Sequence, residues 1–214
     1  GAKALAERGL PSVPKLLELN LRDNDVRSKG AEMIVYRGLS SIRQLTLLDL
    51  RGNNIGDRGL KALAEQGLPL LPQLTILNLA YNEIRSKGAN DLAARGLPSV
   101  PQLAKLMLHD NSIGAAGAKA LAEQGFPSVP ELSYLDISFN PLGYEGIKAL
   151  AARLQILGQL THLNLRNTGT TDEGLKFLAE HGLSSVPWLS HLNLSENLVA
   201  DEGVKALAER GLPS

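Results

Sequence analysis

His162 and His191 lie 29 residues apart, and each is followed by Leu-Asn-Leu. They therefore occupy equivalent positions of a repeated segment and could come close enough to share a metal ion. Neutral imidazole is a common ligand of Zn²⁺, but a zinc site takes three or four protein side chains. The neighbouring Asn164 and Asn193 are poor ligands, and no further His or carboxylate completes the set. The sequence predicts no metal site and no cofactor, and leaves the histidine pair to solvent or to a partner.

Carboxylates and serines also recur in the repeated segment, where they could serve in acid–base or nucleophilic catalysis. The carboxylates are Asp23, Asp49, Asp110, Asp136 and Glu196, and the serines are Ser138 and Ser195. General acid–base catalysis requires an enclosed site that shifts the pKa values of its groups. Repeat positions instead place these side chains on a shallow, solvated surface, and neither serine has a base beside it in sequence. We predict that the chain has no catalytic residue and is not an enzyme.

A nine-residue motif, Leu-x-x-Leu-x-Leu-x-x-Asn, positions all of these residues. Its seven copies begin at Leu16, Leu45, Leu74, Leu103, Leu132, Leu160 and Leu189. The spacing is 29 residues, except for one interval of 28 between Asn140 and Thr168, which replaces the final asparagine of its copy. Repetition at this period predicts a solenoid, in which each unit buries its leucines only against its neighbours.

Each repeat combines a short strand with a helix. In the fourth copy, Leu106 and Leu108 flank Met107, which predicts a strand with one buried face. Asn111 follows at a bend, where its amide can satisfy backbone groups of the turn. Gly117 then opens a helical segment whose small residues allow close packing on the strand. We predict an α/β fold: a right-handed horseshoe-shaped solenoid with seven parallel strands on the concave side and eight helical segments on the convex side.

The helix ends are predicted from residues that commonly cap helices. Residues suited to N-capping stand at the helix starts, and these are Ser28, Asp57, Ser86, Asp172 and Asp201. Glycines suited to the left-handed conformation stand at the helix ends, and these are Gly38, Gly67, Gly96, Gly125 and Gly182. In the short repeat Leu154 replaces this glycine, so we expect the helix to end differently and the local curvature to change. Thr168 should weaken its turn by ~1 kcal/mol, so Thr168→Asn is predicted to raise the thermal midpoint.

The composition excludes several classes of partner and site. The formal net charge is zero, which argues against nucleic acid and anionic membranes as partners. The chain has no cysteine, which excludes disulfides and thiolate metal sites and favours a reducing cytosol. No apolar run approaches the ~20 residues needed to cross a bilayer.

Residues 1–214 are predicted to form a single domain of repeats. The first six residues, Gly-Ala-Lys-Ala-Leu-Ala, match residues 117–122, so the sequence begins inside a repeat and resembles an excised stretch of a longer array. No polar cap is visible at the ends, where Leu5, Leu16, Leu192, Leu194 and Leu207 belong to ordinary internal repeats. We therefore expect either flanking repeats or end-to-end self-association.

The motif is the signature of leucine-rich repeats. The long, helix-bearing repeat resembles the ribonuclease-inhibitor-like subclass over nearly the whole chain, although the alternating cysteines of ribonuclease inhibitor are absent. The Gly-Ala-Lys-Ala-Leu-Ala segment is similar to the GALA-type repeats of bacterial effectors, but this repeat is longer by a Gly-Leu-Pro-Ser-Val-Pro segment. The resemblance implies a module that binds a protein or peptide partner, often on its concave face.

Positions 3, 5, 7 and 8 of the motif vary between copies and are predicted to point into the concavity. At these positions on and just after three central strands, apolar and aromatic side chains gather: Ile76, Tyr81, Met107, His109, Tyr134 and Phe139. Exposed aromatics near the centre of an interface often dominate binding. We predict that this patch binds the partner; the alternative is that its rings only cover the sheet. Trp188 stands at a position that holds a polar residue in the other copies. Its side chain either contacts a partner or packs on a neighbouring loop.

The resemblance leaves several settings open for such a module. It would suit the recognition domain of a bacterial effector, a ubiquitin-ligase adaptor or an immune-type receptor, and an effector would act in the cytosol of its host. A regulator of an enzyme, such as the GTPase-activating members of this repeat class, is an alternative. A structural spacer is a third.

Overall fold

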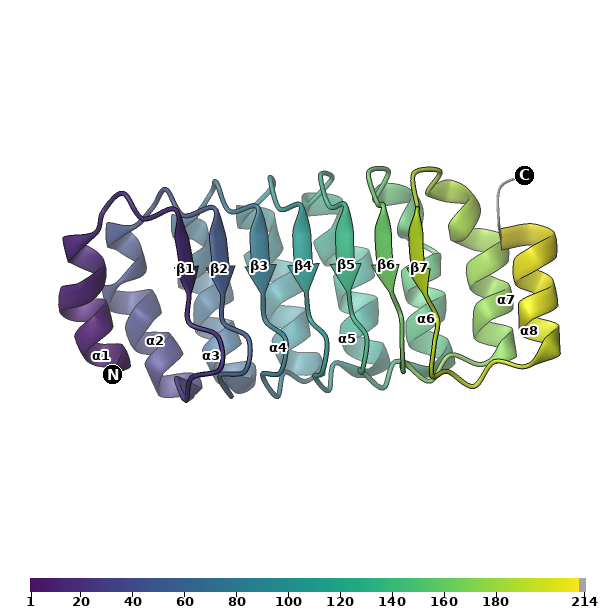
Figure 1. Ribbon diagram of the computed structural model, residues 1–214, viewed down its shortest axis with the longest axis horizontal. Coiled ribbons are helices and arrows are strands. Elements are labelled where there is room, and N and C mark those ends of the chain that lie inside the picture. Colours follow the sequence, from purple (N-terminus) through teal and green to yellow (C-terminus); the bar gives the residue numbers. More distant parts are fainter. Residues whose placement is uncertain (212–214) are drawn as a thin grey trace.

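Seven short parallel strands form one sheet in the computed structural model, which describes residues 1–211 and the side chains through residue 209. Each strand has three residues: β1 Glu18–Asn20, β2 Leu47–Asp49, β3 Ile76–Asn78, β4 Lys105–Met107, β5 Tyr134–Asp136, β6 His162–Asn164 and β7 His191–Asn193. The strands pair in sequence order, with Leu77 beside Leu48 and Leu106. Equivalent motif positions therefore form rows across the sheet, whose strands lie side by side in sequence order in Figure 1.

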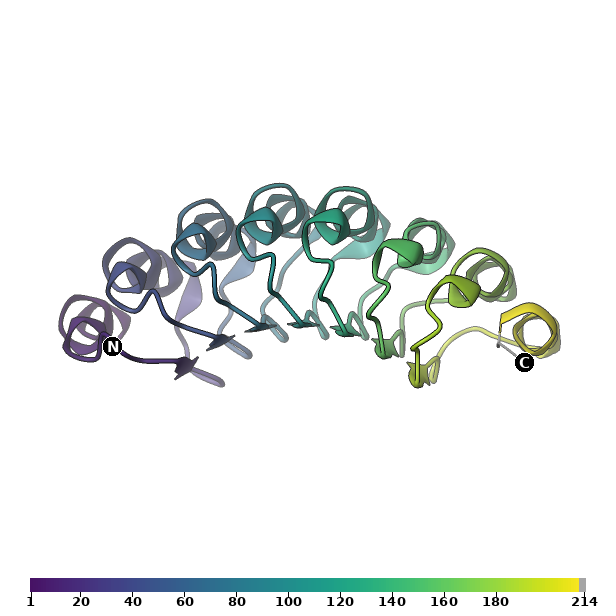
Figure 2. The ribbon, with the colours of Figure 1, turned by 90° about the horizontal axis from the view of Figure 1, so that it is seen from above.

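Helices cover the other side of the sheet. Within the described residues they are α1 Ala2–Ala4, α2 Arg27–Arg37, α3 Gly56–Ala62, α4 Ser86–Asp91, α5 Gly114–Ala120, α6 Gly143–Ala151, α7 Asp172–His181 and α8 Asp201–Ala206. Figure 2 shows the helices on the outer side of an open arc and the strands on its inner side. The predicted solenoid with a concave parallel sheet and convex helices is confirmed. None of the helices in residues 1–211 has the length and apolar character needed to span a membrane.

The leucines of the motif fill the space between the sheet and the helices. Leu77 and Leu106 are fully buried, as predicted, and Leu19 in the first repeat is 7% exposed. The asparagine that ends the motif joins consecutive repeats. Nδ2 of Asn82 donates to the carbonyls of Leu50 and Ala80, while its Oδ1 accepts from the backbone of the preceding repeat. The predicted role in the turn is correct, and the same side chain also bonds the repeat before it.

A π-helical turn, which is wider than an α-helical turn, follows five of the described helices, and a proline explains its position. These turns span Leu5–Gly9, Leu63–Gly67, Leu92–Gly96, Leu121–Gly125 and Leu207–Gly211. In each of these repeats a proline follows the glycine by two residues, whereas α2, α6 and α7 have Ser40, Gln155 and Ser184 there and lack the wide turn. A proline ring clashes with the carbonyl four residues earlier, and a turn closed by bonds five residues apart relieves this clash.

The glycines at the helix ends do not have the left-handed conformation that the sequence predicted. Gly38 has a φ of −108° and Gly96 a φ of −82°, and the others are similar. Close packing requires glycine here instead. A Cβ on Gly38 would lie 2.6 Å from Cδ1 of Leu10 in the preceding repeat and 2.9 Å from the carbonyl oxygen of Ile34. That prediction was wrong because contact between repeats, rather than helix capping, selects glycine.

The predicted N-caps were also wrong: Ser28, Asp57, Ser86 and Asp172 bond the next repeat instead, and Asp201 does not cap α8. Oδ1 of Asp57, in the first turn of α3, accepts from the backbone N–H groups of Arg85 and Gly88 at the start of α4. Asp172 bonds the start of α8 in the same way. Among the described helices, Thr171 is the residue that caps its own helix, by accepting from the N–H of Gly174. The capping oxygen for one helix can therefore come from the repeat before it.

We expect Asp57→Ala to lower the free energy of unfolding by ~1–2 kcal/mol, because two N–H groups at the start of α4 lose their acceptor. Urea denaturation measures the change. Asp57→Asn is the matched control, since its Oδ1 can accept the same bonds, and it should cost less than half as much. Equal losses for the two variants would show that the charge, rather than the hydrogen bonds, stabilises this junction.

The short repeat ends its helix without the terminal glycine, as predicted, but Arg153 stands in its place and the prediction of Leu154 there was wrong: Leu154 begins the following 3₁₀ turn, as Leu39 does after Gly38. Helix α6 runs without a wide turn to Ala151 and is followed by a 3₁₀ turn, Leu154–Ile156. In the next turn, Thr168 replaces asparagine and is fully buried. Its hydroxyl lies within hydrogen-bond distance of the Leu165 carbonyl and of the buried Thr170 hydroxyl. Two threonines thus meet where the other repeats have an asparagine and, two positions later, an apolar residue.

Candidate functional site

The side chain at position 5 of the motif supports the backbone in six of the seven copies. At this position Asp49, Asn78 and Asp136 each accept a hydrogen bond from the backbone N–H two residues further on. Position 5 is one of the variable positions that the sequence predicts to point into the concavity. The sequence did not show the backbone role, which six of the seven copies share because Asn and Asp are interchangeable as acceptors in this turn. Met107 is the exception, and its half-buried side chain belongs to the concave face.

Position 8 has a left-handed backbone in every copy. Five of the seven residues there are Asp23, Gly52, Asp110, Asn167 and Glu196, with φ between 50° and 65°. The other two are aromatic: Tyr81 has a φ of 54° and Phe139 a φ of 51°. Glycine, asparagine and aspartate tolerate this region best, and a bulky residue there costs ~1 kcal/mol or more. The two aromatic residues are therefore held in a backbone conformation that does not favour them.

The structure places the six predicted patch residues on the concave side but in separate groups. Tyr81 is 42% exposed, and the other five are half-buried. Lys105 lies between Ile76 and Tyr134 in the row of position 3. At position 8, the repeat between those of Tyr81 and Phe139 holds Asp110. Of the six residues, Tyr81 and His109 form a ring contact with each other.

Tyr81 belongs to a series of contacts that crosses four repeats. The guanidinium carbon of Arg51 lies 4.6 Å from the centre of its ring. The His109 ring meets it edge-on, with ring centres 5.4 Å apart. Nδ1 of His109 lies 3.4 Å from Oδ2 of Asp136. Burial lowers the pKa of His109, and the carboxylate of Asp136 opposes this shift.

Ser138 joins the same cluster, but in an order that does not suit catalysis. Its hydroxyl donates to Oδ1 of Asp136 at 2.6 Å. In a serine–histidine–aspartate triad the imidazole, not the carboxylate, contacts the serine and takes its proton. Ser138 is also only 2% exposed, so a substrate cannot reach its hydroxyl. The cluster is a packed polar network that supports the sheet surface beneath Tyr81 and His109.

A second group of rings crosses β5, β6 and β7. Tyr134 lies 5.5 Å from His162, which stacks on His191 with ring centres 3.9 Å apart and planes inclined by 8°. Thr161 donates its hydroxyl proton to the carbonyl of Ser133, so it accepts from Nδ1–H of His162. The lone pair of this histidine is therefore on Nε2, and Ser190 fixes His191 in the same way.

This stacked pair does not converge on a shared metal ion. Nearly parallel ring planes confine the two Nε2 lone pairs to separate parallel planes, whereas ligands of one metal ion must point at the same centre. In residues 1–211 no three His, Asp or Glu side chains come together as a metal site. Desolvation and the neighbouring His191 lower the pKa of His162. The pair therefore presents two hydrogen-bond acceptors on the concave face.

Phe139 and Trp188 lie apart from these groups. The guanidinium carbon of Arg166 is 5.0 Å from the centre of the Phe139 ring, and Arg166 also forms an ion pair with Glu196. Trp188, which precedes β7, is 66% exposed and forms no ring contact with the other aromatic residues of the described chain.

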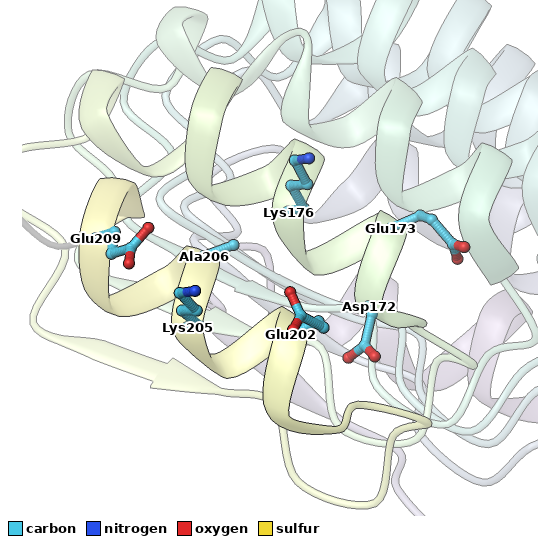
Figure 3. A pocket seen from close by; sticks show the side chains of 7 residues that line it. All are labelled: Asp172, Glu173, Lys176, Glu202, Lys205, Ala206 and Glu209. Carbon is cyan, nitrogen blue, oxygen red and sulfur yellow. The ribbon is translucent and has the colours of Figure 1, made fainter.

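The helical side has a groove of about 420 Å³ between α7 and α8. It is lined by Asp172, Glu173, Lys176, Glu202, Lys205, Ala206 and Glu209. Figure 3 shows these side chains spread along the two helices rather than directed at one point. Asp172 is already bonded to the start of α8. With mixed charges and no converging groups, this groove is a weaker candidate than the concave face.

Sequence reasoning missed Arg51 and Asp136 as parts of the site, and it missed the contact of Arg166 with Phe139 outside it. Each of them contacts a predicted residue that belongs to an adjacent repeat. The sequence does not show toward which adjacent repeat a long side chain extends. One signal was available. Position 7 holds an arginine in three copies, and an aromatic residue stands at position 8 of a repeat adjacent to Arg51 and Arg166. A guanidinium beside an aromatic ring predicts a cation–π contact.

The sequence matches the profile of the leucine rich repeat family in six segments, residues 14–35, 43–64, 71–93, 131–151, 160–179 and 187–208. Together these segments cover more than half of the chain. Among curated proteins no match is found.

Solved structures share the fold at low sequence identity. The mouse RP105/MD-1 complex contains a chain with 22% identity and a TM-score of 0.62, covering 92% of this chain and 29% of that one. The ectodomain of the Arabidopsis receptor kinase HAESA, in complex with an IDA peptide hormone ligand, has 20% identity, a TM-score of 0.55 and coverages of 89% and 28%. Internalin C2 of Listeria monocytogenes has 19% identity, a TM-score of 0.58 and coverages of 97% and 92%. This chain thus spans less than a third of the length of each of the first two chains.

Proposed function

The chain belongs to the leucine-rich-repeat family, and we propose that it is a protein-interaction module that binds a protein or peptide on its concave face. The observation that carries the proposal is Tyr81. Its backbone is in the left-handed region, where Asn or Gly would be more stable, and its ring is 42% exposed. The ring therefore contributes little to the core while imposing strain, which is a common feature of binding sites.

Proteins of the same fold support this reading. The RP105 structure is a complex with MD-1, and the HAESA structure contains a peptide hormone ligand. The helix in each repeat supports a ribonuclease-inhibitor-like repeat, for which a concave protein-binding surface is expected. The recognition domain of an effector, a ligase adaptor or a receptor would each use this surface. A regulator of an enzyme, such as a GTPase-activating protein, is the second candidate.

Site-specific photo-crosslinking tests which face binds. A photoreactive amino acid at position 134 lies on the concave sheet, and one at position 36 lies on α2, where Tyr36 is 53% exposed on the convex side. We expect a crosslinked partner from position 134 and none from position 36. Crosslinks from position 36 alone would move the site to the helices. If the partner is a GTPase, its hydrolysis rate with and without the chain separates the two candidates.

We expect Tyr81→Asn to weaken binding of the crosslinked partner by about 30-fold, as loss of an interface aromatic often costs ~2 kcal/mol. Its free energy of unfolding should stay within ~0.5 kcal/mol of the wild type, because relief of backbone strain offsets the lost ring contacts. Isothermal titration calorimetry and urea denaturation measure the two quantities. Tyr36→Ala is the matched control and should change neither. Unchanged affinity for Tyr81→Asn would remove Tyr81 from the binding surface.

A further inference from the structure

Three arginines occupy position 7 of the motif, and two of them are paired with a carboxylate at position 8. Nε of Arg22 lies 2.8 Å from Oδ2 of Asp23, at position 8 of its own repeat. Arg166 pairs with Glu196, at position 8 of the next repeat. An arginine at position 7 can therefore pair with a carboxylate at position 8 of its own repeat or at position 8 of the next repeat.

Arg51 has no carboxylate at either place. Gly52 stands at position 8 of its own repeat and Tyr81 at position 8 of the next. Among the described residues Arg51 forms no ion pair, and its buried Nε has no hydrogen-bond partner. Its guanidinium instead lies against the Tyr81 ring. An arginine held on an aromatic ring is fixed in position while the N–H groups at its edge remain free for an acceptor.

Carboxylates near Arg51 are already bonded elsewhere. Oδ2 of Asp23 is paired with Arg22. Oδ1 of Asp49 accepts from the backbone N–H of Arg51, and its Oδ2 accepts from Nδ2 of Asn78. Burial lowers the pKa of His109, two repeats away, which disfavours a positive charge on that imidazole. Among the described residues Arg51 is thus a positive charge on the concave face without an ion-pair partner.

We propose that Arg51 and Tyr81 together bind the carboxylate of an aspartate or glutamate side chain of the partner. The inference rests on the proposed function, since it names the group that the concave face recognises. The planar guanidinium offers two parallel N–H donors to a carboxylate, and the partner's acid takes the place that Asp23 and Glu196 fill for the equivalent arginines. Because this acid is supplied by the partner, the Arg51 charge serves recognition and not folding.

Selection from a library of random dodecapeptides tests the proposal, with the peptides attached through their C-termini so that no free terminal carboxylate is present. Binders are selected on the wild-type chain and then measured against Arg51→Gln and Arg166→Gln. We expect the selected peptides to share an Asp or Glu. Arg51→Gln should weaken their binding about 10- to 100-fold, the loss of a charge-assisted hydrogen-bond pair. Arg166→Gln, which removes an arginine already paired with Glu196, should change it less than about 3-fold.

The outcomes separate this inference from the proposed function. Peptides that lose binding with Tyr134→Ala or Tyr81→Asn but carry no acid, or that tolerate Arg51→Gln, would overturn the carboxylate site and leave concave binding in place. Enrichment of Lys or Arg would do the same and would point to Glu83 and Asp110, which line a hollow of about 300 Å³ beside Tyr81. Binders insensitive to Arg51→Gln, Tyr81→Asn and Tyr134→Ala would contradict both the carboxylate site and binding on the concave face. Circular dichroism of each variant shows that it is folded.

Discussion

Asn111→Ala is expected to lower the free energy of unfolding by ~3–5 kcal/mol. The side chain is 8% exposed. Its Nδ2 donates to three carbonyls, those of Leu79, Leu108 and His109, and its Oδ1 accepts from the backbone of the preceding repeat at Asn82 and Ile84. Alanine would leave these groups buried without their partners at a junction in the middle of the solenoid.

Asn24→Ala is the matched control, because Asn24 has the same motif position but is exposed. Its Nδ2 donates to the carbonyls of Leu21 and Arg22 in its own repeat. Water can reach these groups, so the loss should stay near ~1 kcal/mol or below. Urea denaturation of both variants gives the comparison. Similar losses at the two positions would show that the asparagine acts on its own turn, and that the bonds between repeats add no stability.

The fold could be predicted because its main determinant is local and repeated seven times. A leucine at every fixed position of the motif must be buried, and a 29-residue unit buries it only by stacking on its neighbours. Strand positions, the parallel order and the convex helices follow from that requirement. The helix ends could not be predicted in the same way. Gly38 and Asp57 look like capping residues in sequence, but their roles depend on contacts with the adjacent repeat.

The candidate site was only partly predictable for a related reason. The motif assigns Tyr81, His109 and Tyr134 to the concave side, and the structure places them there. It does not distinguish position 5, which supports the backbone, from position 3, which is free, since both alternate with leucine. Nor does it show the left-handed backbone at position 8, because Asp, Gly, Tyr and Phe all occur there. The unusual status of Tyr81 is visible only when its φ of 54° and its exposure are considered together.

The structure changes the expectation for Thr168. The sequence alone predicts that Thr168→Asn stabilises the sixth repeat by restoring the usual side chain. However, the hydroxyl of Thr168 is bonded to that of Thr170, and both threonines are fully buried. Asparagine at 168 would remove this partner from the Thr170 hydroxyl, and a buried unpaired hydroxyl costs ~1–3 kcal/mol. The single substitution should therefore be neutral or destabilising.

A double-mutant cycle tests this coupling. Thr170→Ile restores the apolar residue found two positions after the asparagine in other repeats, as at Ile84 and Ile113. We expect Thr168→Asn/Thr170→Ile to exceed the wild type in free energy of unfolding by ~1–2 kcal/mol, with a favourable interaction energy of similar size between the two sites. Asparagine would then bond the preceding repeat as Asn111 does, and isoleucine would fill the core without a polar group. Additive effects in the cycle would mean that the two threonines do not depend on each other. In that case the hydroxyl pair would contribute nothing to this turn, and the missing asparagine alone would set its stability.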